Sequence, residues 1–255
     1  MKFFLNRYLI CLLIIFVYFP VAENGSPKPT SSLSFIVSIQ MNRLHICTGV
    51  LITDKIVLTA GHCLSGIKDL ESLTIQPNYD DTIHSPADQN KRYGARNKTV
   101  HPNMKQLNHD IGLIELNEKV AEVNGVKALP LSNLTNDEIH EDDFLIMAAW
   151  GYTRNWKFTT KLSLAQIKLL ENKKCVKRFK VRPGNEIICA MSYHTKICRG
   201  DGGAPIFRYD PLTGEKEVIG LLIYATIHCK ADMFIAVQVS SNYDWIKNSI
   251  EYTNE

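Results

Sequence analysis

Apolar and β-branched residues occur along the chain in short runs, which glycine, proline, asparagine and aspartate separate. Such runs predict β-strands, because helices need longer segments with an apolar residue at every third or fourth position. Strands are expected near Val100 and at residues 35–40, 46–53, 55–59, 111–116, 144–150, 163–170, 187–190, 204–207, 218–223 and 234–239. Strands this frequent predict an all-β sandwich or barrel.

Two segments have helical spacing instead. One covers residues 171–178. The other is the tail at 243–252, where Trp245, Ile246 and Ile250 recur at helical spacing and Asn242 is placed to cap the first turn. Strand signals are few between residues 120 and 143, so we expect the chain to cross there between two halves.

The N-terminal segment has the pattern of a secretory signal peptide. Lys2 and Arg7 precede an apolar run at residues 8–19, and small residues lead to a cleavage site after Ala22. The run is too short for a membrane anchor, since a spanning helix needs about 20 apolar residues. We therefore expect a signal peptide at residues 1–22, a single domain at 23–255, secretion to the extracellular space, and no membrane association.

Composition is that of an ordinary globular protein, with 45% hydrophobic and 22% charged residues. Lysine and arginine number 29 against 26 aspartates and glutamates. A balance this even argues against nucleic acid as the main partner.

One basic cluster departs from that balance. Its members crowd ten positions beside Cys175. They are Lys173, Lys174, Lys177, Arg178, Lys180 and Arg182. One interpretation is a binding surface for a polyanion or an acidic protein. The other is a solvated helix face, which is the commoner role of a charge run.

Cysteines and sequons fit an extracellular protein. Six cysteines remain beyond the signal peptide, and an even number in a secreted chain predicts three disulfides, whose pairing the count leaves open. Acceptor sequons for N-glycosylation begin at Asn24, Asn97 and Asn133.

Candidate chemistry occurs at three places. His62 follows a predicted strand, Asp110 stands at the head of another, and residues 198–205 form a glycine-rich turn behind Cys198. Each feature alone has an ordinary structural explanation, as a loop histidine, a turn aspartate or a tight turn.

Together, in this order, the three motifs resemble the chymotrypsin/trypsin family of serine proteases, with its TAxHC, DIxLI and GDSGGP motifs. Residues 101–103 (HPN), 149–151 (AWG) and 243–246 (YDWI) extend the resemblance over almost the whole mature chain. It implies two six-stranded antiparallel β-barrels with a cleft between them and a C-terminal helix. It also implies three disulfides, Cys47–Cys63, Cys175–Cys189 and Cys198–Cys229.

The resemblance assigns roles to the motif residues. His62 matches the general base, Asp110 matches the acid that orients it, and Gly200 lies on the turn that supplies half of the oxyanion hole. Asp201 precedes the nucleophile position, which should be serine. It is Gly202, and without a side-chain oxygen the histidine has no hydroxyl to activate.

The specificity pocket and the activation site also depart from the family pattern. Lys196 falls on the pocket floor, Ala225 on its entrance and Phe234 on its wall. We expect no activation cleavage ahead of the domain, so Asp201 needs a partner other than a new N-terminus. We expect that partner to be His45, with Lys196 as its rival.

These departures favour a secreted serine protease homologue that binds rather than cleaves, resembling the non-catalytic members of the family. Its partner would be a protease, a protease inhibitor or a cascade component. The alternatives are an active endopeptidase with an unrecognised nucleophile and a polyanion-binding module.

We expect no cofactor and no metal. His194, His228, Cys198 and Cys229 lack the spacing of a zinc site. The acidic loop at residues 69–81 shows no recognisable calcium pattern.

Overall fold

The computed structural model describes the greater part of the chain after the N-terminal segment. The described residues are 33–77, 91–120, 126–135, 137–140, 143–151, 162–181, 184, 186–193, 197–209, 213–225 and 232–251. The signal-peptide prediction, Asn24, Arg182, Lys196 and Cys229 lie outside them.

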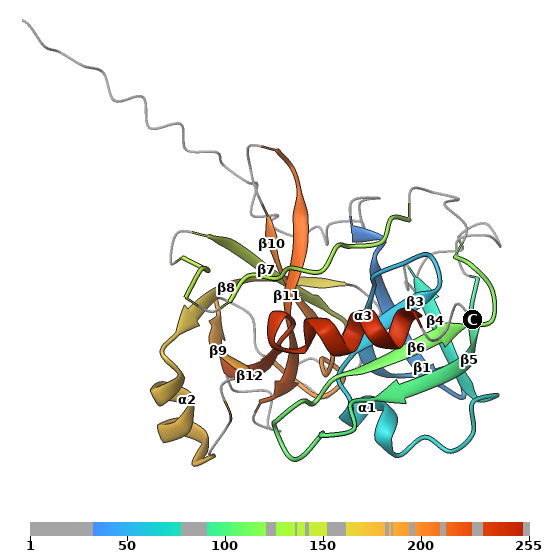
Figure 1. The fold of residues 1–255 in the computed structure, drawn as a ribbon, viewed down its shortest axis with the longest axis horizontal. Helices are drawn as coiled ribbons and strands as arrows, with labels where there is room; N and C mark the ends of the chain where they lie inside the picture. The colour runs from blue at the N-terminus through green and yellow to red at the C-terminus, as the bar shows by residue number, and fades with distance from the viewer. Residues whose placement is uncertain are drawn as a thin grey trace, which may run out of the picture.

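The first half of the chain forms a closed barrel of antiparallel strands (Figure 1). Its strand order is β1-β2-β3-β6-β5-β4. The strands are β1 (Ile36–Met41), β2 (Leu44–Leu51), β3 (Ile56–Thr59), β4 (Leu73–Pro77), β5 (Tyr93–Val100) and β6 (Gly112–Leu116). A short helix, α1 (His62–Ser65), follows β3.

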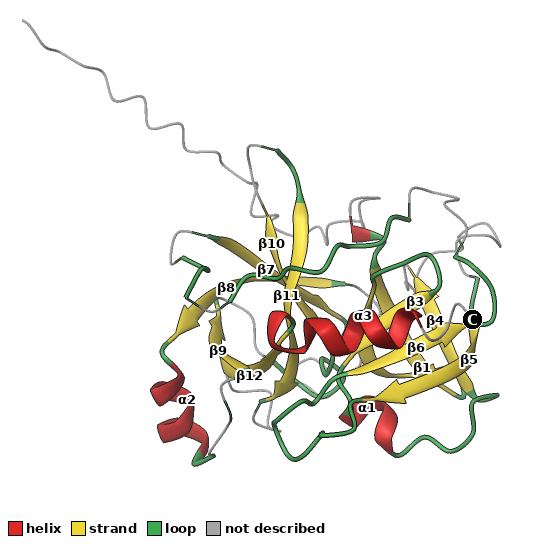
Figure 2. Ribbon diagram, in the orientation of Figure 1, coloured by secondary structure: helices red, strands yellow, loops and turns green. Residues whose placement is uncertain are grey.

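The second half forms another closed antiparallel barrel, with the order β10-β11-β12-β9-β8-β7. Its strands are β7 (Phe144–Ala149), β8 (Ser163–Leu170), β9 (Ile187–Ser192), β10 (Pro205–Tyr209), β11 (Lys216–Tyr224) and β12 (Met233–Gln238). Helix α2 (Asn172–Phe179) joins β8 to β9, and α3 (Tyr243–Glu251) ends the described chain. Strands dominate, as Figure 2 shows, and the predicted fold class is confirmed.

Burial explains why these segments pair. Apolar side chains such as Ile36, Val57 and Ile114 are fully buried in the first barrel, and Ile206 and Val237 are fully buried in the second. Closure of each sheet leaves no strand edge unpaired. Among the described residues, no helix combines the length and the apolar character of a membrane span.

The apolar pattern missed β4 and most of β5. In β5 the buried side chains are Tyr93 and Ala95, while Arg96 and Asn97 are exposed. The strand exists because its backbone pairs with β4 and β6, which are distant in sequence. Whether a polar segment forms a strand depends more on the strands beside it than on its own pattern of apolar residues.

Asn242, the predicted helix cap, binds groups outside the helix. This residue lies in a 3₁₀ turn, Ser240–Asn242, directly before α3. Its side-chain amide donates to the Gln238 carbonyl at 2.8 Å, and its oxygen is 2.8 Å from Nδ1 of His109. A tertiary contact with the loop before β6 therefore replaces the local cap.

The two barrels meet at the glycine-rich turn of the second barrel. The Thr48 amide of β2 donates to the Gly202 carbonyl at 2.8 Å. A side chain at Gly203, where φ is +77°, would lie 2.2 Å from both the Thr48 carbonyl and the Thr59 hydroxyl. Glycine is required there by close packing of the barrels as well as by backbone conformation.

Candidate functional site

His62 and Asp110 are brought together by the pairing of β3 with β6. Thr59 of β3 is opposite Gly112 of β6, so the residues that flank these strand ends are neighbours. The Asp110 carboxylate is buried and binds His62 twice. Its Oδ2 is 2.8 Å from Nδ1 of the ring, and its Oδ1 accepts the His62 backbone N–H at 2.6 Å. Asp110 thereby orients the ring and leaves Nε2 on the opposite side.

Nε2 of His62 faces position 202. A Cβ placed on Gly202 would lie 2.9 Å from Nε2, closer than side-chain carbons normally approach. A histidine in this position could act as a general base, but residue 202 offers it no side-chain oxygen to deprotonate. The ring also occupies part of the space that a side chain at 202 would need.

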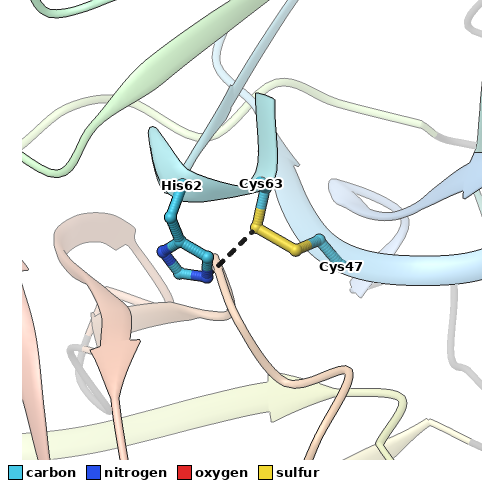
Figure 3. A group of neighbouring side chains, drawn as sticks. All are labelled: Cys47, His62 and Cys63. Atoms are coloured by element: carbon cyan, nitrogen blue, oxygen red, sulfur yellow. Dashed lines mark hydrogen bonds between the residues drawn. A yellow bond between two sulfur atoms is a disulfide. The ribbon is translucent and has the colours of Figure 1, made fainter. Parts of the chain in front are cut away.

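A disulfide lies beside the ring (Figure 3). Cys63 is bonded to Cys47, and the Cys63 sulfur is 3.6 Å from Nε2 of His62. The two sulfurs and a ring nitrogen lie within 4.8 Å of one another, a spacing that could serve a metal ion. A cysteine binds a metal ion as its thiolate, however, and the disulfide leaves neither Cys47 nor Cys63 in that form.

The turn before Gly202 is held by His45 of β2. Gly200 has φ +93°, and its carbonyl accepts a hydrogen bond from Nε2 of His45 at 2.9 Å. Nδ1 of the same ring is 2.8 Å from the Ser38 hydroxyl. Burial lowers the pKa of His45 to about 4, so the ring is neutral at physiological pH.

Asp201 is a second buried acid of the site. Its Oδ2 accepts the Cys198 N–H at 2.7 Å, and its carboxylate packs against the backbone of Gly151. Burial raises the pKa of Asp201 to about 7, and the hydrogen bond from Cys198 opposes that rise. The pair with His45 expected from the sequence is not among the contacts of this carboxylate within the described residues.

The segment ahead of Asp110 contains a histidine pair that the sequence analysis did not single out. The rings of His101 and His109 stack at 4.3 Å, and His101 packs on Trp245 of α3 at 4.8 Å. Nε2 of His109 is 3.3 Å from Glu186, and Nδ1 binds Asn242. These contacts tie the Asp110 loop to the second barrel and to α3. The sequence feature that could have drawn attention to this pair is the position of His109 directly before Asp110.

Similarity to known proteins agrees with this geometry. Residues 22–246 match the family model described as Trypsin. The chain belongs to the trypsin family. Granzyme M of Rattus norvegicus is 29% identical over 236 residues, covering 89% of this chain and 88% of that protein. A chymotrypsin of Phaedon cochleariae is 25% identical over 222 residues, 86% and 77% of the two chains. Trypsin iota of Drosophila melanogaster is 27% identical over 201 residues, 74% and 75%.

The disulfides follow the trypsin-family pairing wherever both partners are described. Cys47 is bonded to Cys63, and Cys175 is bonded to Cys189. Cys198 is also disulfide-bonded. Of the sequons, Asn97 on β5 and Asn133 in the segment before β7 are exposed, as an acceptor for glycosylation must be.

Two of the three positions that match the trypsin-family specificity pocket are described. Phe234 is fully buried on β12 and belongs to the same apolar cluster as Ile197 and Leu222, with Ala225 packed against it. Tyr224, at the end of β11, is 39% exposed and contacts Phe179 of α2 with ring centroids 5.3 Å apart. A large apolar ring is therefore fully buried at the position that the resemblance assigns to the pocket wall.

Proposed function

We propose that this chain is a secreted trypsin-family protein that binds a protein partner and does not cleave peptide bonds. The observation that carries the proposal is the relation of His62 to Gly202. The base is oriented by Asp110 and faces position 202, which has no hydroxyl to deprotonate. The nearby sulfurs of Cys47 and Cys63 cannot replace it, because both are held in a disulfide.

The surroundings of the Asp201 carboxylate support the proposal. In the family, this aspartate pairs with the ammonium group created by activation cleavage. Here the carboxylate is buried with one hydrogen bond, from Cys198, among the described residues, and its pKa is raised to about 7. A carboxylate stabilised by a charged partner would have a lowered pKa instead. A neutral Asp201 would need no ammonium partner, as the proposal requires.

Phe234 also supports the proposal. A peptide substrate inserts a side chain into the primary pocket, and Phe234 occupies the matching position as part of a packed apolar cluster. A partner would then recognise the surface of the cleft rather than its deep pocket. An inhibitor captured as a decoy, or a protease assisted within a cascade, would be bound in this way.

The export and domain predictions belong to the same proposal. Residues 1–22 direct secretion and are removed, and residues 23–255 form the trypsin-like domain, with glycans at Asn24, Asn97 and Asn133. Disulfides at Cys47–Cys63 and Cys175–Cys189 are consistent with an oxidising compartment.

The test is labelling of the secreted full-length protein with a fluorophosphonate probe, which reacts with activated serine hydroxyls. Trypsin at the same concentration is the positive control, and heat-denatured protein controls for non-specific reaction. We expect no label above the denatured control. Stoichiometric label that a serine-protease inhibitor blocks would restore the endopeptidase interpretation.

A further inference from the structure

Helix α2 carries most of the basic cluster and stands at one side of the second barrel (Figure 1). Cys175 is fully buried and bonded to Cys189 of β9, so one side of the helix is attached to the barrel. Phe179 on the same side packs on Tyr224. The opposite side is left to solvent.

The exposed cations gather on that opposite side. Lys173, Lys174, Lys177 and Arg178 are all exposed. At 3.6 residues per turn they fall within an arc of about 140°, centred opposite Phe179. Spacing of i, i+4 places Lys173 beside Lys177 and Lys174 beside Arg178. We call these four residues the α2 cationic face.

Charges of the same sign at this spacing repel one another, so the α2 cationic face is not explained by helix stability. The window 171–180 holds five cations and a single anion, Glu171. Glu171 pairs with Lys173, which lowers the pKa of that carboxyl. Lys177 and Arg178 belong to the last turn, where the helix dipole favours cations but adds no counter-ion. An external polyanion would supply the missing charge.

The composition of the face distinguishes between polyanions. Protein interfaces place apolar residues at their centre and are depleted of charged residues there. On α2 the large exposed apolar residue is Val176, which helical geometry puts outside the cationic arc. A double row of cations with no apolar centre matches a flexible chain of sulfate groups better than a folded acidic protein. We propose that the α2 cationic face binds a linear sulfated polysaccharide.

This binding is independent of the proposed partner binding at the cleft. Phe179 contacts Tyr224, at the end of β11, from the side of the helix opposite the cations. A polysaccharide on the α2 cationic face therefore does not cover Tyr224 or the end of β11. The two proposals can fail separately, because fluorophosphonate labelling reports on a reactive hydroxyl, whereas heparin binding reports on the surface of α2.

The experiment measures binding of the full-length secreted protein to heparin, by chromatography and by titration over a range of salt concentrations. The test variant carries Lys174→Gln, Lys177→Gln and Arg178→Gln. The matched control carries Lys68→Gln, Lys127→Gln and Lys247→Gln, which remove the same charge from exposed positions elsewhere. Thermal unfolding of each variant confirms that the protein is folded.

We expect elution from heparin well above about 0.2 M salt, because several phosphate-like contacts give a steep salt dependence. The test variant should bind at least about tenfold more weakly, with a log–log salt slope smaller by about two to three. The control should bind like the unmodified protein. Elution below that salt concentration, or equal weakening in both variants, would overturn the proposal. Equally tight binding of poly-glutamate through the same face would also overturn it and assign the face to acidic proteins.

Discussion

His62 and Gly202 face each other across the junction of the two barrels, with Nε2 of the ring 2.9 Å from the place of a Cβ on residue 202. Asp110 holds the ring in this position from the other side. The base and its orienting acid are thus arranged around a residue that offers no side chain.

The first prediction concerns repair of the nucleophile. We expect Gly202→Ser to restore neither fluorophosphonate labelling nor peptide cleavage. The serine Cβ would crowd Nε2 of His62, and Phe234 would remain packed in its apolar cluster. Labelling and peptide hydrolysis of the variant are compared with those of Gly202→Ala, which introduces the same crowding without a hydroxyl. Appreciable cleavage by the serine variant alone would contradict this expectation.

The second concerns the filled pocket. Phe234→Ala should lower the free energy of unfolding by about 3–5 kcal/mol, because it removes a fully buried ring from a packed cluster. Leu164→Ala on β8, at 40% exposure, should change it by less than about 1 kcal/mol. Urea unfolding measures both. A loss below about 1 kcal/mol for Phe234→Ala would mean that the ring borders an open pocket.

The third concerns the retained pair. Asp110→Ala should cost about 1–3 kcal/mol of stability, because it leaves the partly buried N–H of His62 without its acceptor. Asp54→Ala breaks an exposed ion pair with Lys119 and should cost less than about 1 kcal/mol. Such a result, measured by urea unfolding, would explain the presence of Asp110 by structure alone. Equal and negligible losses would point to a functional role for the pair.

The fourth concerns pH. Burial raises the pKa of Asp201 to about 7, so below pH 7 the folded protein binds a proton that the unfolded chain releases above its ordinary pKa of 3.8. The contribution of Asp201 to stability therefore falls as pH rises from about 4 to 7. His45 acts in the opposite direction. Its folded pKa is about 4 against 6.5, so its contribution rises with pH between these values.

Below pH 6.5 the contributions of Asp201 and His45 to stability change with pH in opposite directions. The substitution Asp201→Asn removes the first and leaves the second. The variant keeps an acceptor for the Cys198 N–H but cannot titrate. The free energy of unfolding of the variant should rise with pH between about 4 and 6.5. That of the unmodified protein should rise less steeply, and the two slopes should differ by at most about 1.4 kcal/mol per pH unit. Urea unfolding from pH 4.5 to 8 measures the profiles. Parallel curves for the two proteins would contradict the raised pKa.

Several features of the site were predictable because neighbouring residues in the chain define them. The segments around His62, Asp110 and Gly202 carry their chemistry in local motifs, and the apolar runs identified strands such as β1 and β6. The absence of a side-chain nucleophile at residue 202 likewise follows from the sequence alone, because the residue is glycine. No folding event can supply an oxygen that glycine lacks.

Tertiary structure decided the rest, because strand pairing and hydrogen-bond partners depend on residues far apart in the chain. β5 is polar and becomes a strand through its neighbours. The sequence predicted that His45 pairs with Asp201 and that Asn242 caps the following helix. In the structure, His45 binds the Gly200 carbonyl and Asn242 binds His109. Buried polar groups take whichever partner satisfies them in the packed interior. Local motifs therefore determined which residues stand at the site, while closure of the two barrels determined what each of them touches.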